Sequence, residues 1–569
     1  MNKKDIIQLL EKIALYLEIK GESNFRVSAY RKAAQAIERD ERSLGEIDDF
    51  GQIKGIGKGT NAVISEFIET GNSVTLTELE SEIPVSLLDL LHIPGLGGKR
   101  IAKLYQELNI IDIASLKEAC TNESLEQLPG FGKTTVKNIL KAINELNQRP
   151  ERIPAAIMLS LAEKIEAALL EIPSIIRFSR AGSLRRMREM LKDIDFIIAT
   201  ENSRATGEAL VNLDGVKEII AHGDTKVSVV FADVYDISVD FRLVTKSEFA
   251  TTLHHFTGSK DHNIVMRQIA KSRGEKINEY GVVNEETGKT QTFTSEEKFF
   301  AHFDLPFIPP EIREGTDEFI QMKEKQSFIS PEDILGDLHL HTTWSDGAGS
   351  IEEMVQAAIE RGYKYMAITD HSKFLRVANG LYENRLKRQI EEIISIRDKY
   401  PDFYIFTGTE MDILPDGSLD FDDEMLSKLD FVIASIHSSF NQTEEQIMHR
   451  LYQAMENPFV NLIAHPTGRI LGGRAGYDVN VEKLIEKAVE TGTALEINAN
   501  PHRFDLSAKW ARIAEEQGAI LSINTDAHNI QGLNHMGYGV SVAKRGFIQK
   551  DTVINTWSLE KLKAFITKN

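Results

Sequence analysis

The segment GDLHLHTTWSDG, residues 336–347, contains three side chains of the kinds that bind metal ions. His339 and His341 are two residues apart, so on a β-strand both would lie on one face, and Asp346 follows shortly after. Imidazole and carboxylate together suit Zn²⁺, Mn²⁺ or Fe²⁺. A single histidine near a strand end is more often an ordinary hydrogen-bonded polar residue than a ligand. The segment alone therefore leaves both interpretations open.

The same arrangement recurs along the C-terminal half, where strand-like apolar runs end on a histidine or an acid. The runs YMAITDH, YIFTGTE, FVIASIH, NLIAHP and SINTDAH contribute the candidate ligands His371, Glu410, His437, His465, Asp526 and His528. In parallel βα barrels, functional sites gather at the C-terminal ends of the strands. The nine candidates are too many for one tetrahedral ion, so they predict a cluster of two or three metals. Such clusters hydrolyse phosphoesters, because the metals activate a bound water and neutralise phosphate oxygens.

A second set of acids lies in the N-terminal half. Asp193 and Asp195 precede an apolar run, and Asp240 lies in another strand-like run, SVDFRLV. An isolated Asp-x-Asp is usually a solvated strand end. Three carboxylates on one sheet face, however, repel one another unless cations neutralise them, and two Mg²⁺ ions are the natural solution beside a triphosphate. Gly182 and Ser183, with Arg185 and Arg186 after them, form a plausible cradle for that triphosphate.

Three glycine-rich turns precede this region, in IKGIGKGT, IPGLGGKRIAKLY and LPGFGKTTVKNIL. Each places Gly-x-Gly before a helical segment, and the glycines are Gly55, Gly57, Gly95, Gly97, Gly130 and Gly132. Such turns bring backbone N–H groups close to a ligand, and a following helix N-terminus offers more donors to a phosphate. A helix C-cap glycine would explain one such turn equally well. Three of them are less easily explained in this way, and they resemble helix-hairpin-helix motifs, a resemblance that implies binding to DNA backbone phosphates.

The elements that would position these residues change character along the chain. Residues 1–150 are expected to form short helices, and residues 151–315 alternate helices with strands. A polar stretch ends this half near residue 330, and βα alternation then predicts a parallel sheet, possibly closed into a barrel.

Composition limits the class of protein. The 569 residues are 42% hydrophobic and 27% charged, which is ordinary for a globular protein. There is no apolar run of about 18 residues, so no membrane span is expected. The single cysteine, Cys120, excludes an internal disulfide and fits a reducing cytoplasm. The net charge of −20 argues against a bulk polyanion binder, although metal ions can oppose it locally.

Residues 1–315 resemble a family X DNA polymerase, similar to DNA polymerase beta. The pattern Gly-Ser-x-Arg-Arg, Asp-x-Asp and a distal Asp is met by Gly182, Ser183, Arg185, Arg186, Asp193, Asp195 and Asp240. The resemblance assigns the three acids to two Mg²⁺ ions, and Asp240 also to activation of the primer 3′-OH. It assigns Ser183, Arg186 and Arg152 to the triphosphate.

The same resemblance extends to the segments on either side. In HHFTGSKDHNIVMRQIA it implies that His255, Gly258 and Asn263 bind the nucleotide and that Arg267 approaches the template. In SAYRKAA and just before it, Arg26 and Tyr30 are expected to contact DNA near a 5′-phosphate in a gap.

Two departures from the family pattern have consequences. The usual tyrosine of the thumb turn is His255 here, so discrimination between deoxyribose and ribose is expected to differ. The lysine used for 5′-deoxyribose-phosphate lyase chemistry aligns with Val63, which cannot form a Schiff base, although Lys58 lies nearby.

Residues 333–569 resemble a PHP (polymerase and histidinol phosphatase) domain, with all nine ligands of that family's metal site present. The resemblance implies a cluster of two or three Mn²⁺ or Zn²⁺ ions. Arg469 and Arg474 follow His465 on a loop, where they would meet substrate phosphate or simply be exposed.

Together the resemblances imply a multidomain α+β and α/β chain. The expected parts are a small helical 5′-phosphate-binding domain (1–85), helix-hairpin-helix fingers (86–150), a nucleotidyltransferase palm (151–250), a thumb (251–315), a linker (316–332) and a distorted (β/α)7 PHP barrel (333–569).

The implied function is gap filling on gapped or primer-template DNA with dNTPs in base excision repair, by a cytoplasmic monomer. A 3′–5′ exonuclease, and an abasic-site endonuclease as a further expectation, would reside in the PHP domain. One alternative makes the PHP domain a small-molecule phosphatase or only a structural module. Another makes the whole chain a DNA-binding scaffold, which the intact acid sets disfavour.

Overall fold

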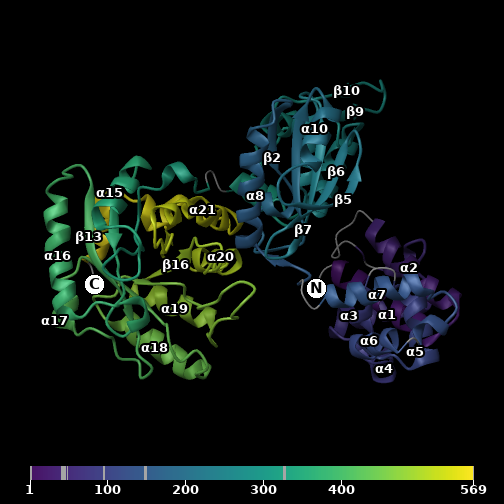
Figure 1. Cartoon of the computed structure of the whole chain (residues 1–569), viewed down its shortest axis with the longest axis horizontal. Coiled ribbons are helices and arrows are strands. Elements are labelled where there is room, and N and C mark those ends of the chain that lie inside the picture. The colour runs from purple at the N-terminus through teal and green to yellow at the C-terminus, as the bar shows by residue number, and fades with distance from the viewer. Residues whose placement is uncertain are drawn as a thin grey trace. The chain divides into compact units, whose positions relative to one another are not determined.

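The computed structural model describes residues 3–39, 47, 49–93, 96–122, 124–146, 150–324 and 328–567. The chain divides into two compact units, residues 1–150 and 151–569 (Figure 1). Among the described residues, no helix combines the length and apolarity needed to cross a bilayer. The multidomain α+β and α/β fold class predicted from the sequence is confirmed.

The first unit is helical and has one hydrophobic core. Its helices are α1 (Lys3–Lys20), α2 (Asn24–Arg39), α3 (Lys58–Thr70), α4 (Val74–Glu82), α5 (Gly98–Leu108), α6 (Ile113–Thr121) and α7 (Lys133–Leu146). In α1 the apolar side chains recur every three or four residues and are almost completely buried, as in Ile6, Leu10 and Ile13. They belong to the same cluster as Ile139 and Ile143 of α7, so the two regions expected at 1–85 and 86–150 share one core.

The palm in the second unit is a five-stranded sheet in the order β2-β4-β7-β6-β5. The strands are β2 (Ile175–Arg180), β4 (Ile194–Thr200), β5 (Val216–His222), β6 (Lys226–Ala232) and β7 (Asp236–Val244). All neighbours are antiparallel except β4 and β7, which run parallel. Both strand-like runs that carry the acids therefore lie side by side in the centre of the sheet.

The thumb packs around phenylalanines. It contains α11 (Phe249–Thr257), α12 (Lys260–Ser272), the short strands β8 (Glu275–Ile277), β9 (Val282–Asn284) and β10 (Thr290–Gln291), and α13 (Glu296–His302). Phe299 and Phe300 are fully buried in its core. The expected linker contains the helix α14 (Glu318–Glu324).

The C-terminal part is a parallel barrel whose seven strands are paired in chain order. They are β11 (Gly336–Asp337), β12 (Tyr365–Ile368), β13 (Tyr404–Asp412), β14 (Phe431–Ser435), β15 (Leu462–Ile463), β16 (Ala494–Asn498) and β17 (Leu521–Asn524). Just beyond the first and last strands, Leu340 and Ala527 form a parallel bridge, which brings the two ends of the sheet together. The predicted (β/α)7 barrel is thus confirmed as nearly closed.

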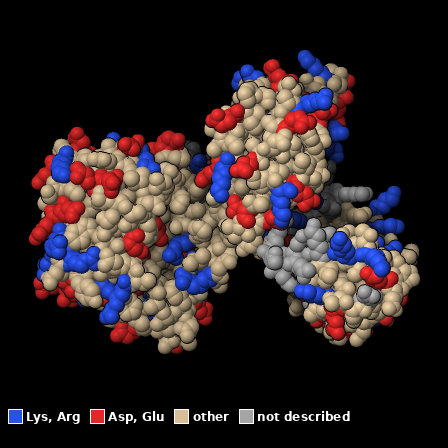
Figure 2. All heavy atoms as spheres, viewed as in Figure 1, with Lys and Arg blue, Asp and Glu red and all other residues tan. Residues whose placement is uncertain are grey.

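Helices cover the outside of this barrel. They are α15 (Ile351–Glu360), α16 (Glu383–Arg397), α18 (Glu444–Glu456), α19 (Val481–Thr491), α20 (Ala508–Glu516) and α21 (Met536–Arg545), drawn green to yellow in Figure 1. The strands are almost entirely buried, as expected for a parallel sheet covered on both faces. Acidic and basic side chains form separate small groups on the face of the barrel seen in Figure 2, with broad areas of other residues between them.

A buried ion-pair group joins palm and thumb. Glu296 of α13 accepts hydrogen bonds from Arg185 of the palm and from Arg313, whose side chain is fully buried. Burial raises the pKa of the Glu296 carboxyl, but the charges of Arg313 and Arg185 outweigh it and lower the pKa to about 2.

We expect Glu296→Gln to lower the free energy of unfolding by about 3 kcal/mol at pH 7, since the folded pKa lies about 2.5 units below the ordinary 4.5. A carboxyl with a depressed pKa stabilises the fold above pH 4.5, and this stabilisation is lost as pH falls from 4.5 toward 2. Urea unfolding at pH 7 and pH 3.5 should show the difference between the two proteins shrinking. The control is Glu297→Gln, at the exposed neighbouring position. An equal effect of both variants on the free energy of unfolding would contradict the stabilising role of Glu296.

Candidate active sites

The three acids of the palm are brought together by strand pairing. Asp195 in β4 lies opposite Asp240 in the parallel neighbour β7, and Asp193 lies two residues before Asp195. Lys226 of β6 forms an ion pair with Asp240, with 2.7 Å between Nζ and Oδ2. The sheet therefore collects three carboxylates at one point, as the sequence pattern predicted.

The electrostatics of this point favour a bound cation. Burial, followed by the negative charges of Asp193 and Asp240, raises the pKa of the Asp195 carboxyl to about 7. A divalent ion would reverse this shift, because it neutralises the repulsion and takes oxygen ligands. The donor set thus fits Mg²⁺.

Gly182 is required for the approach of the neighbouring loop to this site. Its φ is +60°, and a Cβ atom there would lie 2.2 Å from Oδ2 of Asp195. Only glycine combines that backbone conformation with such a close contact. Ser183 follows directly in the short helix α9 (Gly182–Arg185), so its position relative to the acids depends on Gly182.

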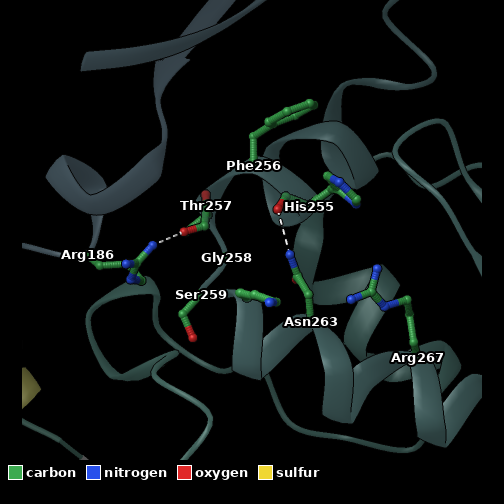
Figure 3. Close-up of a pocket in the computed structure, with 9 residues that line it drawn as sticks. Arg186, His255, Phe256, Thr257, Gly258, Ser259, Asn263 and Arg267 are labelled. Atoms are coloured by element: carbon green, nitrogen blue, oxygen red, sulfur yellow. Dashed lines mark hydrogen bonds between the residues drawn. The ribbon is translucent and has the colours of Figure 1, made fainter. Parts of the chain in front are cut away.

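A pocket of about 360 Å³ lies between the palm and the thumb turn (Figure 3). Its walls include the predicted nucleotide residues Arg186, His255, Gly258 and Asn263, and also Arg267. Nδ2 of Asn263 donates to the His255 carbonyl at 2.7 Å, and Arg186 donates to the carbonyl of Thr257. Burial lowers the pKa of His255, so its ring is neutral at pH 7.

Some residues of this region lie differently from the expectation. Arg152 does not line the pocket; its exposed side chain is near the carbonyl of Met190, 3.5 Å away. Phe256 and Lys260 line the pocket without having been singled out. Their position within the HHFTGSK segment is the signal that would have identified them.

The glycine turns of the first unit present open backbone. Gly57 and Gly97 precede α3 and α5 as N-cap residues, and Gly132 directly precedes α7. A Cβ at any of these three would meet nothing within 4 Å, and the same holds at Gly130. Gly55, like Gly130, has a positive φ, which favours glycine. Gly95 lies outside the described residues.

Of the two residues expected to contact DNA near a 5′-phosphate, one lies on the surface and the other in the core. Arg26 is exposed and pairs with Glu22 at 3.0 Å, whereas Tyr30 is only 7% exposed and packs in the core. Val63 is also buried. Phe25, which the sequence patterns did not single out, is 86% exposed beside Arg26, and its ring is free to stack on a base.

In the barrel, Glu410 at the end of β13 is the centre of the candidate metal cluster. Its carboxylate oxygens lie within 3.5 Å of a ring nitrogen from each of five histidines: His339, His341, His371, His437 and His465. Although burial raises the pKa of Glu410, these histidines lower it well below its usual range. Asp526 lies 3.2 Å from His341, and Asp346 lies 3.4 Å from His528.

The unpaired atoms of this cluster fit metal ions. Nε2 of His339, both ring nitrogens of His341, Nδ1 of His371 and Oε2 of Glu410 are buried and have no hydrogen-bond partner. Unpaired buried polar atoms are costly, and metal coordination removes that cost. Burial and the neighbouring His371 and His528 lower the pKa of His341 to about 3, which leaves it the neutral imidazole that metals bind.

Eight of the nine candidates form three overlapping groups of potential ligands. The groups are His341 with Asp346, His371 and His528; His339 with His341 and Asp526; and His371 with Glu410 and His437. The shared members His341 and His371 link the groups, which agrees with a cluster of two or three ions. His465 adds a nitrogen 3.0 Å from Glu410.

Glu496 of β16 orients this cluster from behind and was not singled out from the sequence. It is fully buried, and its oxygens face Nδ1 of His339 at 2.8 Å and the backbone N–H of His465 at 2.7 Å. A carboxylate on the far nitrogen fixes the ring orientation of a metal-binding histidine. The sequence does not mark this residue as functional, because Glu496 lies inside the continuous run ALEINAN. Its role becomes visible only when the strands are paired in the barrel.

Arg469, in the loop after β15, lies differently from the expectation, and another arginine approaches the candidate cluster. Arg469 is held in a bidentate ion pair with Glu189 of the palm, at 2.8 and 3.1 Å, so it is committed to a structural contact. Arg503, which had not been singled out, lies 3.6 Å from Asp526. It is therefore the cation closest to this candidate ligand in the described part of the chain.

We expect Glu496→Gln to weaken metal binding about 10- to 100-fold, because the amide no longer fixes His339 in the ligand orientation. Equilibrium dialysis against limiting Mn²⁺, with metal content determined by mass spectrometry, measures this directly. Glu490→Gln, on the exposed face of α19, is the control. Unchanged metal content in Glu496→Gln would remove the orienting role.

Comparisons with known proteins agree with this division into sites. Family models match the DNA polymerase beta thumb at residues 252–314, a helix-hairpin-helix domain at 1–73, a SAM-like helix-hairpin-helix tandem at 87–145 and the PHP domain at 337–500.

Several relatives match only part of the chain. A probable phosphatase from Syntrophotalea carbinolica is 29% identical over 41% of this chain and 96% of its own length. One from Thermoanaerobacter sp. (strain X514) is 30% identical over 40% of this chain and 93% of its own.

One relative matches the whole chain. The DNA polymerase/3'-5' exonuclease PolX of Bacillus subtilis (strain 168) is 55% identical over 569 residues, which is 100% of both chains. The chain therefore belongs to the PolX family of DNA polymerases with 3′–5′ exonuclease activity, as the two resemblances predicted.

Proposed function

We propose that the palm catalyses template-directed addition of dNTPs at Asp193, Asp195 and Asp240. The pairing of Asp195 with Asp240 on adjacent parallel strands carries this proposal. Bound there, two Mg²⁺ ions would neutralise the triphosphate. Asp240, which lies on the same sheet face as Asp195, would accept the proton of the primer 3′-OH.

The nucleotide would occupy the pocket of Figure 3. The cationic side chains Arg186, Lys260 and Arg267 line it and suit an anionic ligand. Ser183 would hydrogen-bond the triphosphate from the turn at Gly182. The neutral ring of His255 would face the sugar, where a less bulky group than tyrosine gives weaker exclusion of ribose. Arg152 lies outside this pocket and would reach the triphosphate only after movement of its exposed side chain.

The barrel would cleave phosphodiester bonds at the 3′ end of DNA, and would also cut at abasic sites. The contact of one carboxylate, Glu410, with five histidines carries this proposal. Mn²⁺ or Zn²⁺ ions held there would supply the activated water and neutralise the phosphate. Substrate would enter on the side of Asp346 and His528, whose side chains are 34% and 37% exposed, because the other ligands are buried.

The open turns at Gly57, Gly97 and Gly132 would grip the DNA backbone, and short gaps in base excision repair would be the polymerase substrate.

A second candidate function for the barrel is small-molecule phosphatase activity. The similarity of 29–30% to probable phosphatases favours it. Comparing p-nitrophenyl phosphate with a 3′-labelled oligonucleotide under Mn²⁺ separates the two.

The two sites should be separable by mutation. Asp193→Ala is expected to reduce dNTP incorporation at least 100-fold and to leave exonuclease activity unchanged, because it weakens only the palm metal site. His339→Ala with His341→Ala is expected to do the reverse. Both proteins are assayed on one gapped, end-labelled duplex with Mg²⁺ and with Mn²⁺. Loss of both activities in either folded protein, checked by circular dichroism, would contradict the two-site assignment.

We also expect no Schiff-base lyase activity through position 63, because the buried Val63 carries no amine. Borohydride should trap little covalent adduct on a 5′-deoxyribose-phosphate substrate. Lys58→Ala tests the exposed lysine at the start of α3 as a substitute. An adduct formed in high yield by the wild-type chain and retained in Lys58→Ala would contradict this expectation.

A further inference from the structure

One carboxylate of the thumb pairs with arginines from two other parts of the second unit, the palm and the barrel domain. Glu314, at the end of the thumb, lies 3.2 Å from Nε of Arg186 and 3.6 Å from Nη1 of Arg188, both in the palm. Nη1 of Arg545, the last residue of α21 in the barrel domain, lies 2.8 Å from Oε1 of the same carboxylate. The barrel domain therefore reaches a residue that lines the nucleotide pocket.

Arg545 also contacts Arg186 directly. Its Nη1 also donates to the main-chain carbonyl of Arg186 at 2.8 Å. The Arg545 side chain is 15% exposed. Two residues later, Phe547 is 4% exposed and packs in the thumb core. Arg545 is thus held against Arg186 and Glu314 by packing as well as by charge.

The charge balance among Glu314, Arg186 and Arg545 decides whether the Arg186 guanidinium is available to a ligand. Glu314 paired with Arg186 alone would form a neutral pair, and Arg186 would be held by a protein carboxylate rather than by a ligand. Besides Arg188, Arg545 gives Glu314 a further cationic partner, and it lies closer to the carboxylate than Arg186 does, at 2.8 Å against 3.2 Å. Although burial raises the pKa of Glu314, Arg545 and Arg186 lower it overall, so it stays ionised.

The guanidinium of Arg186 retains a donor for a ligand. Nε faces Glu314 and Nη1 donates to the Thr257 carbonyl (Figure 3). Among the described residues Nη2 has no hydrogen-bond partner, and Arg186 lines the pocket with Gly258 and Lys260. A positive charge with one free donor in that wall is what a triphosphate oxygen requires.

We propose that Arg545 of the barrel domain is a positioning residue of the polymerase site. It shares the charge of Glu314 and holds the main chain of Arg186, so that the Arg186 guanidinium is available to the triphosphate. The proposal rests on the proposed role of Arg186 in dNTP binding. It makes the PHP domain a part of the polymerase site as well as the carrier of the nuclease.

The test is steady-state dNTP incorporation by the full-length protein on gapped DNA. Arg545→Met is expected to raise KM for dNTP about tenfold with kcat within about twofold, since ground-state triphosphate binding is weakened. Exonuclease activity on the same DNA should be unchanged. Arg545→Lys, which restores the charge without the fork, should recover part of the loss.

Arg512 provides a matched control. It lies in α20 of the same domain and pairs with Asp317 at 2.5 Å, close to Glu314 in sequence, but no contact joins it to Arg186. If Arg545 only attached the barrel to the thumb, Arg512→Met would raise KM by the same factor. We expect it to leave KM unchanged.

A double variant tests the mechanism. In Arg545→Met with Glu314→Gln, the carboxylate that would hold Arg186 is gone, so KM should return toward the wild-type value. An unchanged KM in Arg545→Met, or equal effects of Arg545→Met and Arg512→Met, would overturn the proposal. Arg186→Met distinguishes a failure of the proposed role of Arg186 from a failure of the proposed role of Arg545. If it fails to raise KM, the assignment of Arg186 to the triphosphate is wrong; if it alone raises KM, only the role of Arg545 is wrong.

Discussion

The contact between the Glu410 carboxylate and five histidines is the constraint on which the barrel domain depends. Burying a carboxylate is costly unless cations or hydrogen bonds compensate it, and a cluster of polar atoms without partners is equally unfavourable. The barrel brings these side chains to one end although the outermost of them, His339 and His465, are 126 residues apart in sequence, and the bridge between Leu340 and Ala527 brings the two ends of the sheet together. Glu496 then fixes the orientation of His339 from behind.

The palm also holds carboxylates close together, but through a different geometry. There the carboxylates repel one another, and the parallel pairing of β4 with β7 holds Asp195 beside Asp240 in spite of that repulsion. Gly182 allows the turn that carries Ser183 to approach the same point. The palm site is therefore incomplete in charge without cations, and bound cations would also oppose the net charge of −20 near a polyanion.

Palm and barrel are joined by more than a linker. Apolar residues of the palm, such as Leu159, belong to the same buried cluster as Val540 of α21. Ion pairs from Arg469 and Arg545 cross between the same two parts. This continuity gives a physical route by which a barrel residue acts on the polymerase pocket.

The sequence by itself determined the identities of both sites. Asp-x-Asp before one apolar run, and histidines at the ends of five others with Glu410 at the end of a sixth, predicted the acids and metal ligands, because side-chain alternation on strands is a local property. What only the tertiary structure decided involves residues without a local signature. Glu496 lies within an ordinary strand, Tyr30 is buried rather than exposed, and Arg545 ends a helix far from the palm in sequence. Their roles depend on which surfaces pack together, and packing brings together segments whose separation in sequence carries no information about their distance in space.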